Sequence, residues 1–234
     1  MHVSISEAGP PATATRPASR LRSTQADRSA RTRGALLESA ARGLSRYGYR
    51  NLVLERVASG AGYTRGALYH QFKDKEDLAL AVIDWVDQTW RQDVGRLVDQ
   101  EPDPLRALIG LARGHAVYCR RDVARVGIAL RLEFSGQDHR VGRHVERVYE
   151  SLVKRCACLL GAGRRAGTIP AGPPVRVAAL ALIGALEGTV IQLAGQPRHD
   201  EELAARAVAG VRGLRLDEVS LSPSPGGRPQ AQAR

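Results

Sequence analysis

The sequence predicts an all-α protein of about nine helices, because helical periodicity runs through most of it. Of the 234 residues, 43% are hydrophobic but only 4% are aromatic. This composition is ample for a core and favours helices that pack closely through small side chains. The sequence has no runs in which β-branched or aromatic residues alternate with polar ones, the pattern that would indicate strands.

The two ends of the chain lack this periodicity. Residues 1–26 are rich in Pro, Ala, Ser, Thr and Arg, and residues 217–234 end in the run SLSPSPGGRPQAQAR. Segments of this composition bury too little apolar surface to offset the entropy of ordering them. We therefore expect a disordered arm at 1–26 and a disordered tail at 217–234.

The first helix is predicted from Arg28 to Tyr47, where apolar residues recur at helical spacing. They form one stripe of Leu36, Leu37, Ala40, Ala41, Leu44 and Tyr47. Gly48 would end this helix, since glycine readily adopts the left-handed conformation that stops one. A short helix is expected at about 54–59, and the tight turn GAG at 60–62 separates it from a second short helix.

A long helix is predicted from about Lys75 to Val98, and the run EPDP at 101–104 interrupts it. Pro104 suits the start of the next helix, because the N–H that proline lacks would be unpaired there. Further helices are expected at 104–119, 122–134, 139–166, 174–195 and 199–214. The chain thus divides near residue 75 into a small N-terminal domain, 27–75, and a larger apolar domain, 76–216.

Positive charge is concentrated in the smaller domain. The formal net charge is +11, and from Arg28 to Lys75 there are ten Lys or Arg residues against three Asp or Glu residues. A general bias toward arginine is the alternative explanation, since the sequence has only three lysines, but such a bias would spread the charge evenly. The distribution favours a localised surface for nucleic acid.

The three cysteines, Cys119, Cys156 and Cys158, form no disulfide framework. Cys156 and Cys158 would point to different sides of a helix, so we expect a reducing, cytoplasmic compartment. The N-terminus has no apolar core for a signal peptide. The longest apolar stretch, 177–186, is half a membrane span and is closed by Glu187, so we expect no membrane contact.

Two short helices joined by a glycine-containing turn are typical of a helix-turn-helix. Its inner side would consist of Leu54, Val57, Ala58, Tyr63, Ala67, Leu68 and Phe72. The residues facing outward from the second helix would be Thr64, Arg65, Gly66, Tyr69 and His70. Thr64 is placed to cap this helix through its hydroxyl.

The outward residues suit a division of roles on DNA, because the start of the second helix in such motifs meets base edges in the major groove. Arg65 would pair with guanine N7 and O6, and Gly66 would let the backbone approach closely. Phosphate contacts, which give affinity and register but not sequence, are expected from Tyr69, His70, Lys73 and Lys75.

The residues around this motif strengthen the interpretation. The most diagnostic run is GALYHQFKDKEDL at 66–78, and further positions are Leu36, Leu37, Ala40, Ala41, Leu44, Gly48, Tyr49, Val57, Ala58, Ala61 and Gly62. Over about 55 residues the pattern resembles the DNA-binding domain of the TetR/AcrR family of bacterial transcriptional repressors. The C-terminal part resembles the family only in the general type of its helices: the runs GRRAGTIP and ALALIGALEGTVIQLA look like the family's last helix before the dimer bundle and its dimerising helix. The resemblance implies a homodimer, a palindromic operator and a ligand pocket in the C-terminal domain.

The resemblance also assigns individual residues. The family's recognition helix falls on 64–70, its phosphate-contacting tyrosine on Tyr69, and the lysine that opens its fourth helix on Lys75. The sequence departs from the family at 52–54, where LVL replaces the usual Thr or Ser before the second helix. That helix lacks its capping hydroxyl, which leaves Asn51 as the candidate cap and DNA contact.

Polar and aromatic residues interrupt the apolar faces of the larger domain and are candidates for an effector pocket. They are His115, Tyr118, Cys119, Phe134, Tyr149 and Glu187. The first three would equally suit a core with satisfied hydrogen bonds. Glu187 would also suit a dimer seam or a local hydrogen bond. Glu133 is a further polar residue on an apolar face, and it would equally suit a position that faces solvent. The spacing of His139 and His144 is not that of a zinc site, so we expect no metal and no cofactor.

The helix expected at 174–195 carries small residues on more than one side. They are Ala178, Ala179, Ala181, Gly184, Ala185 and Gly188. A helix buried on two sides lies between its own domain and another subunit. With the helix at 199–214 it would form half of a four-helix bundle in a homodimer.

These observations favour a ligand-responsive transcriptional regulator, most simply a repressor, that binds a palindromic DNA operator as a homodimer. A small-molecule effector would release it by shifting the helix at 75–98. One alternative is a helical enzyme, against which the sequence shows no nucleophile–base–acid set and no phosphate-binding glycine loop after a strand. The other is a non-specific DNA-packaging protein, which predicts evenly spread charge and no pocket.

Overall fold

The computed structural model describes residues 24–192 and 198–211, and across these ranges all regular secondary structure is helical, which confirms the predicted fold class. The predicted tail at 217–234, and the predicted arm up to residue 23, lie outside the described residues. The elements are α1 Gln25–Tyr47, α2 Leu54–Gly60, α3 Arg65–Gln71, α4 Lys75–Trp90, η1 Arg91–Gly95, α5 Arg96–Gln100, α6 Pro104–Cys119, η2 Asp122–Arg125, α7 Val126–Glu133, α8 Arg140–Arg165, α9 Val175–Gln192 and α10 Asp200–Val211.

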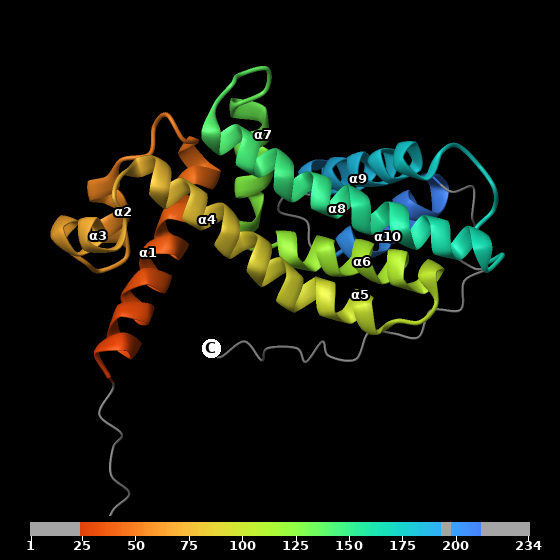
Figure 1. The fold of residues 1–234 in the computed structure, drawn as a ribbon, viewed down its shortest axis with the longest axis horizontal. Helices are drawn as coiled ribbons and strands as arrows, with labels where there is room; N and C mark the ends of the chain where they lie inside the picture. The colour runs from red at the N-terminus through yellow and green to blue at the C-terminus, as the bar shows by residue number, and fades with distance from the viewer. Residues whose placement is uncertain (1–23, 193–197, 212–234) are drawn as a thin grey trace, which may run out of the picture.

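Figure 1 shows two groups of helices joined by α4. Helices α1, α2 and α3 form one group, and α6, α8, α9 and α10 form the other. Helix α4 leaves the first group and continues through η1 and α5 along the second. Helix α7 lies against both α1 and α8, so it also links the two groups.

Helix α1 begins at Gln25, inside the stretch expected to be disordered. A capping box explains this correction: the backbone N–H of Asp27 donates to the Thr24 hydroxyl at 3.1 Å, and the Thr24 N–H donates to the Asp27 carboxylate at 2.8 Å. These bonds satisfy N–H groups that the first turn of a helix leaves unpaired.

The apolar stripe of α1 is buried as predicted except at its end. Leu36, Leu37, Ala40, Ala41 and Leu44 are buried, whereas Tyr47 is 55% exposed. Leu52, from the loop that follows, is buried instead and sits against Gly43, where an added Cβ would lie 2.7 Å from the Leu52 Cδ1. Glycine at this position therefore lets Leu52 complete the core beside α1.

The long helix predicted at 75–98 is present as α4, η1 and α5, which follow one another without a break. Its middle part, η1, is a π-helical turn. A π turn widens the helix and changes the direction of its side chains, and such turns are frequent at functional sites. Val94 within it packs against Gly114 of α6, where an added Cβ would lie 3.0 Å from the Val94 Cγ1. The turn begins at Arg91, which lines the cavity described below.

Two large apolar clusters form the core. One unites α1–α4 with residues of α7 and the start of α8, namely Val126, Leu130, Phe134, Val141 and Val145. The other fills the space among α6, α8, α9 and α10. The sequence division near residue 75 is therefore not a division between two cores, because the first cluster continues into the larger part of the chain.

Helix α9 is apolar on two sides. It is the one helix in the described ranges long and apolar enough to cross a membrane, with a mean hydropathy of 1.5. One side is buried in the second cluster through Ala178, Ala179, Leu182, Ile183 and Leu186. On the other side Val177, Leu180 and Ile191 are between 49% and 59% exposed.

Candidate DNA-binding surface and effector cavity

Helices α2 and α3 form the predicted helix-turn-helix. Gly62 adopts φ +77°, which favours glycine, and the Tyr63 N–H donates to the Ala58 carbonyl at 2.9 Å to close the turn. The predicted inner residues are all buried or partly buried, with Val57, Ala58, Leu68 and Phe72 at the centre. The predicted inner side of the motif is confirmed.

The predicted outward face of α3 is exposed over Thr64, Arg65, Gly66, Tyr69 and His70, and Lys73 just beyond it is exposed as well. The Thr64 hydroxyl accepts the Ala67 N–H at 3.2 Å, which confirms it as the cap. Beside Gly66, the nearest atom to an added Cβ is 3.8 Å away, so no neighbour within the protein requires glycine at this position.

Arg65 is held by two neighbours. Its Nη1 lies 2.7 Å from Glu55 Oε1 on α2, and its Nη2 donates to the Tyr69 hydroxyl at 3.3 Å. The hydrogen bond to Tyr69, and then the charge of Glu55, raise the pKa of Arg65. Glu55 was not predicted from the sequence as part of this surface, because an acidic residue in the first turn of a short helix is usually a solvated helix-dipole partner.

Helix α3 is fixed to α1 behind its exposed face. The Gln71 side-chain amide donates to the Ser29 hydroxyl at 3.1 Å, and the Arg33 guanidinium donates to the Gln71 carbonyl at 3.1 Å. The same guanidinium lies 4.4 Å from the centre of the Phe72 ring. These contacts hold the end of α3 against α1.

Asn51 lies in the loop between α1 and α2, and Lys75, the first residue of α4, contacts this loop. The prediction that Asn51 caps α2 is wrong. The Asn51 amide donates to the Tyr47 carbonyl at 3.0 Å, and Val53, at the N-cap position of α2, makes no side-chain cap. The Lys75 ammonium donates to the Arg50 carbonyl at 2.9 Å and lies 4.8 Å from the centre of the Tyr49 ring. Burial lowers the pKa of Lys75.

Glu133, the last residue of α7, is partly buried and binds this loop. Its carboxylate accepts the backbone N–H of Tyr49 at 2.5 Å and that of Arg50 at 2.8 Å. Gly48 makes room for it: φ is +73°, and an added Cβ would lie 2.6 Å from the Glu133 Oε2. We call this pair of hydrogen bonds from Tyr49 and Arg50 to the Glu133 carboxylate the Glu133 clamp.

Phe134 was predicted to line an effector pocket, but it packs beside the Glu133 clamp and does not line the cavity described in the next paragraph. It is 7% exposed, stacks on His139 at 4.4 Å between ring centres, and lies 5.4 Å from Tyr49. Helix α7 ends at Glu133, so the chain turns at Phe134 and directs its ring toward the α1–α2 loop. Nearby contacts join α1 to η2 and α4 to α8: Arg46 is ion-paired with Asp122, Arg140 is ion-paired with Glu76, and the His144 Nε2 lies 2.6 Å from the Asp84 Oδ1.

A cavity of about 140 Å³ lies among α4, α6, α7, α8 and α9. Four of the predicted pocket residues line it: His115, Tyr118, Tyr149 and Glu187. Cys119 is not part of the lining, and its thiol lies 3.5 Å from the His115 Nε2. Most of the wall is apolar and comes from Ile83, Val86, Trp90, Ala124, Val126, Val145, Val148, Leu152, Ile183 and Leu186.

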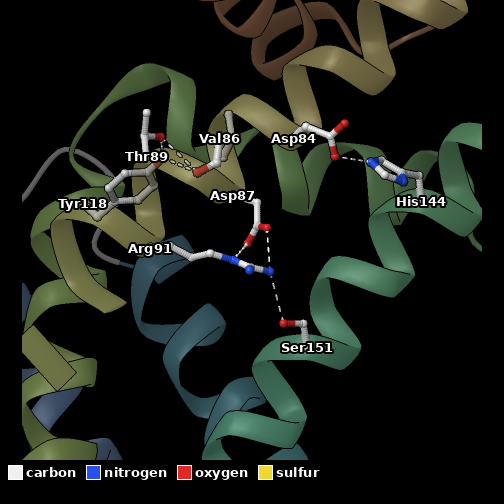
Figure 2. Close-up of polar contacts among 8 residues, drawn as sticks. All are labelled: Asp84, Val86, Asp87, Thr89, Arg91, Tyr118, His144 and Ser151. Carbon is white, nitrogen blue, oxygen red and sulfur yellow. Dashed lines mark hydrogen bonds and ion pairs between the residues drawn. The ribbon is translucent and has the colours of Figure 1, made fainter. Parts of the chain in front are cut away.

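Two polar groups in the wall are bonded within the protein. The Trp90 indole N–H donates to the His115 Nδ1 at 3.1 Å, and burial lowers the pKa of His115 to about 4. The Tyr118 hydroxyl donates to the Val86 carbonyl at 3.0 Å and lies 2.7 Å from the Thr89 hydroxyl (Figure 2). His115 and Tyr118 thus line the cavity and also have the satisfied hydrogen bonds expected of core groups.

Glu187 and Tyr149 form the other polar part of the wall. The Glu187 Oε1 lies 3.6 Å from the Arg131 Nη1 and has no hydrogen-bond partner among the described residues. Arg131 lies 4.0 Å from the centre of the Tyr149 ring and also donates to Glu146 at 2.9 Å. Burial raises the pKa of Tyr149, and so do the charge of Glu187 and the hydrogen bond that the Tyr149 hydroxyl donates to the Glu187 carboxylate.

Charged residues of α4 and α8 border the cavity and were not predicted from the sequence. Arg91 lies 2.9 Å from the Asp87 carboxylate and donates to the Ser151 hydroxyl at 3.4 Å, which joins α4 to α8 across the space shown in Figure 2. Arg155 is ion-paired with Asp99. An acid and a base four residues apart, such as Asp87 and Arg91, are usually a solvated pair on a helix face, so the sequence held no signal for this role.

Comparison with known proteins agrees with the geometry of the first group of helices. Residues 36–82 match the family model described as bacterial regulatory proteins, tetR family. The HTH-type transcriptional repressor KstR2 of Mycobacterium tuberculosis is 37% identical over 83 residues, which are 34% of this chain and 40% of that protein. The chain therefore matches about two fifths of this curated relative's length.

Solved structures extend the likeness to the whole fold. SCO4454, a TetR-family transcriptional regulator from Streptomyces coelicolor, superimposes with a TM-score of 0.66 at 23% identity, over 79% of this chain and 95% of that one. AibR, solved with isovaleryl coenzyme A and operator DNA, superimposes with a TM-score of 0.63 at 18% identity, over 79% of this chain and all of that one. The helix-turn-helix and the family match agree: residues 36–82 are similar to the DNA-binding region of bacterial regulatory proteins of the tetR family, and the fold is similar to that of the two solved structures.

Proposed function

We propose that the protein is a ligand-responsive transcriptional regulator, most simply a repressor, that binds a palindromic operator as a homodimer and leaves it when a small molecule occupies the cavity. One observation carries this proposal: a single helix, α4, begins directly after the exposed face of α3 and supplies Ile83, Val86 and Trp90 to the cavity wall. A change in the cavity can therefore move the recognition helix. The named relatives are regulators of transcription, which supports a regulator and not an enzyme.

On DNA, we propose that α3 enters the major groove. Arg65 would read a guanine and Gly66 would allow close approach, while Tyr69, His70 and Lys73 contact phosphates. Two such helices in a homodimer would lie about one helical turn of DNA apart, roughly 34 Å. Lys75, which holds the Arg50 carbonyl, would act on phosphates together with the loop it fixes.

The homodimer is proposed to form through α9 and α10. Exposed apolar side chains on α9 need a cover, and nothing lies within 4 Å of an added Cβ at Gly184 or Gly188. Leu203 on α10 is also exposed. Small and apolar residues on one face of two neighbouring helices suit a four-helix bundle with a second copy of the chain.

Within this proposal, residues 27–75 carry DNA binding, and residues 76–216 carry effector binding and dimerisation. Gel shifts with the gene's own upstream DNA, in the presence of excess unrelated DNA, test it. A specific regulator gives a discrete complex that survives the competitor. A DNA-packaging protein loses its complex to the competitor, and an enzyme gives no complex. We further propose that the protein acts in the cytoplasm, where its DNA is.

A further inference from the structure

We propose that the cavity takes a compact, electrically neutral and mainly apolar molecule that donates one hydrogen bond to Glu187, and that it does not take an acyl-coenzyme A. The inference rests on the proposed function only in treating the bound molecule as the effector. Its support is the size of the cavity, the pairing of its charges and the Glu187 Oε1, which has no hydrogen-bond partner among the described residues.

The size and lining of the cavity set the first limit. A cavity of about 140 Å³ with a mostly apolar wall is comparable to the engineered apolar cavities of about 150 Å³ that bind benzene. A single ring with a short substituent therefore matches the volume of this space. The aromatic and aliphatic wall would contribute most of the affinity by removing that ring from water.

The charges at the cavity set the second limit. Its lining contains two arginines, and both are paired within the protein, Arg91 with Asp87 and Arg155 with Asp99. An anion would have to displace a carboxylate from one of them. His115 offers no positive charge either, because its Nδ1 accepts a hydrogen bond from Trp90 and the buried ring is neutral at physiological pH. Coenzyme A carries several phosphate charges, so this wall disfavours it.

Glu187 sets the third limit. Its charge is balanced by Arg131 at 3.6 Å, but this distance is longer than a hydrogen bond, and Arg131 already donates to Glu146. The Glu187 Oε1 can therefore still accept a hydrogen bond, and the negative charge of the carboxylate already has a positive partner in Arg131. The wall's other deep polar groups are bonded inside the protein: His115 to Trp90, Tyr118 to Val86, and Tyr149 to the Glu187 carboxylate. A neutral hydroxyl on the ligand matches this arrangement.

Isothermal titration calorimetry on the full-length, DNA-free protein tests the inference with four probes: 4-methylphenol, toluene, 4-methylbenzoate and isovaleryl-coenzyme A. We expect 4-methylphenol to bind about tenfold more tightly than toluene, because only the phenol bonds to Glu187. We expect the benzoate and the coenzyme A thioester to bind more weakly than either. Equal binding of phenol and toluene, tighter binding of an anion, or no binding of the phenol at millimolar concentration overturns the inference.

Two pairs of variants locate the effect. Leu152→Trp fills the cavity and should abolish binding of both neutral probes, whereas Leu132→Trp, at a position 73% exposed, should not. Glu187→Leu should remove the preference for the phenol over toluene. Glu187→Gln keeps an acceptor and the side-chain shape, so it should retain part of that preference even if the leucine variant fails to fold. A preference unchanged in Glu187→Gln and Glu187→Leu, or phenol binding unchanged in Leu152→Trp, contradicts the assignment.

Ligand binding and specific DNA binding are measured in separate experiments, so the ligand class and the proposed function can fail separately. If the phenol binds as expected but the upstream DNA gives no specific complex, the proposed function fails and the ligand class stands. If the DNA complex is specific but only an anion binds the cavity, the ligand class fails and the proposed function stands.

Discussion

The Glu133 clamp should make the loop between α1 and α2 rigid, and Glu133→Ala tests this. The variant removes the acceptor of two backbone N–H groups, at 2.5 and 2.8 Å. Hydrogen bonds to a charged group contribute about 1.5–3 kcal/mol each, but the loop is partly exposed to solvent, so we take about 2 kcal/mol for both together. This free energy corresponds to roughly a 30-fold increase in local opening of the loop.

Amide hydrogen exchange at Tyr49 and Arg50, followed by NMR, measures that opening directly. We expect exchange of both amides to become roughly 30-fold faster in Glu133→Ala, and Tm to fall by about 4–8 °C for a chain of this size. Glu133→Gln keeps one neutral acceptor, so its effect should be about half as large in free energy.

Asp138→Ala is the matched control. Asp138 is a carboxylate five residues further along the chain, its side chain is 87% exposed, and it is ion-paired with Arg143. It should leave the Tyr49 and Arg50 amides unchanged. If Glu133→Ala folds and both amides exchange at the wild-type rate, or if Asp138→Ala accelerates them equally, the clamp does not stabilise the loop.

Three further predictions follow from the surface, the dimer and the buried histidine. Arg65→Ala should reduce the free energy of DNA binding by about 1–3 kcal/mol and relax the sequence preference. Lys75→Ala should weaken binding to all DNA sequences alike and reduce the slope of log affinity against log salt concentration by about one. Footprinting and salt titrations that match wild type refute both roles. Gly184→Arg should convert the dimer to a monomer, and light scattering that shows a wild-type monomer at micromolar concentration refutes the proposed interface. Because burial lowers the pKa of His115 from 6.5 to about 4, the unfolded chain takes up a proton that the folded protein does not, so stability should fall as pH decreases from 6.5 toward 4. His115→Gln should remove up to about 2 kcal/mol of the stability lost between pH 7.5 and 5, and urea unfolding at these two pH values that shows equal losses in wild type and variant contradicts it.

The local features of the molecule were predictable from the sequence. The spacing of small and apolar residues in the helix-turn-helix depends on helical periodicity over about 20 residues, so the inner and outer sides of α3 could be derived. Helix boundaries were predictable where a proline, a glycine or a capping side chain marks them, as at Thr64 and Pro104. The start of α1 was placed too late because the capping box at Thr24 lies in a stretch of disorder-like composition.

Contacts between distant segments were not predictable from the sequence. The Tyr49 N–H and the Glu133 carboxylate are 84 residues apart, and nothing near either residue indicates the other. Phe134 interrupts an apolar face as a pocket residue would, but the end of α7 turns it toward Tyr49. Cys119 shares a helix face with His115 but does not line the cavity. In each case periodicity gives a side chain's face but not its tertiary neighbour.

The central claim is that the cavity and the recognition helix are coupled through α4. Fluorescence anisotropy of labelled upstream DNA, titrated with wild type and with Leu152→Trp, tests it without knowledge of the effector. Coupling free energies between sites are typically about 1–3 kcal/mol, so filling the cavity should change the affinity for specific DNA by about 5- to 150-fold, while Leu132→Trp leaves it unchanged. Equal affinity of wild type and a folded Leu152→Trp variant for the specific DNA would contradict the coupling.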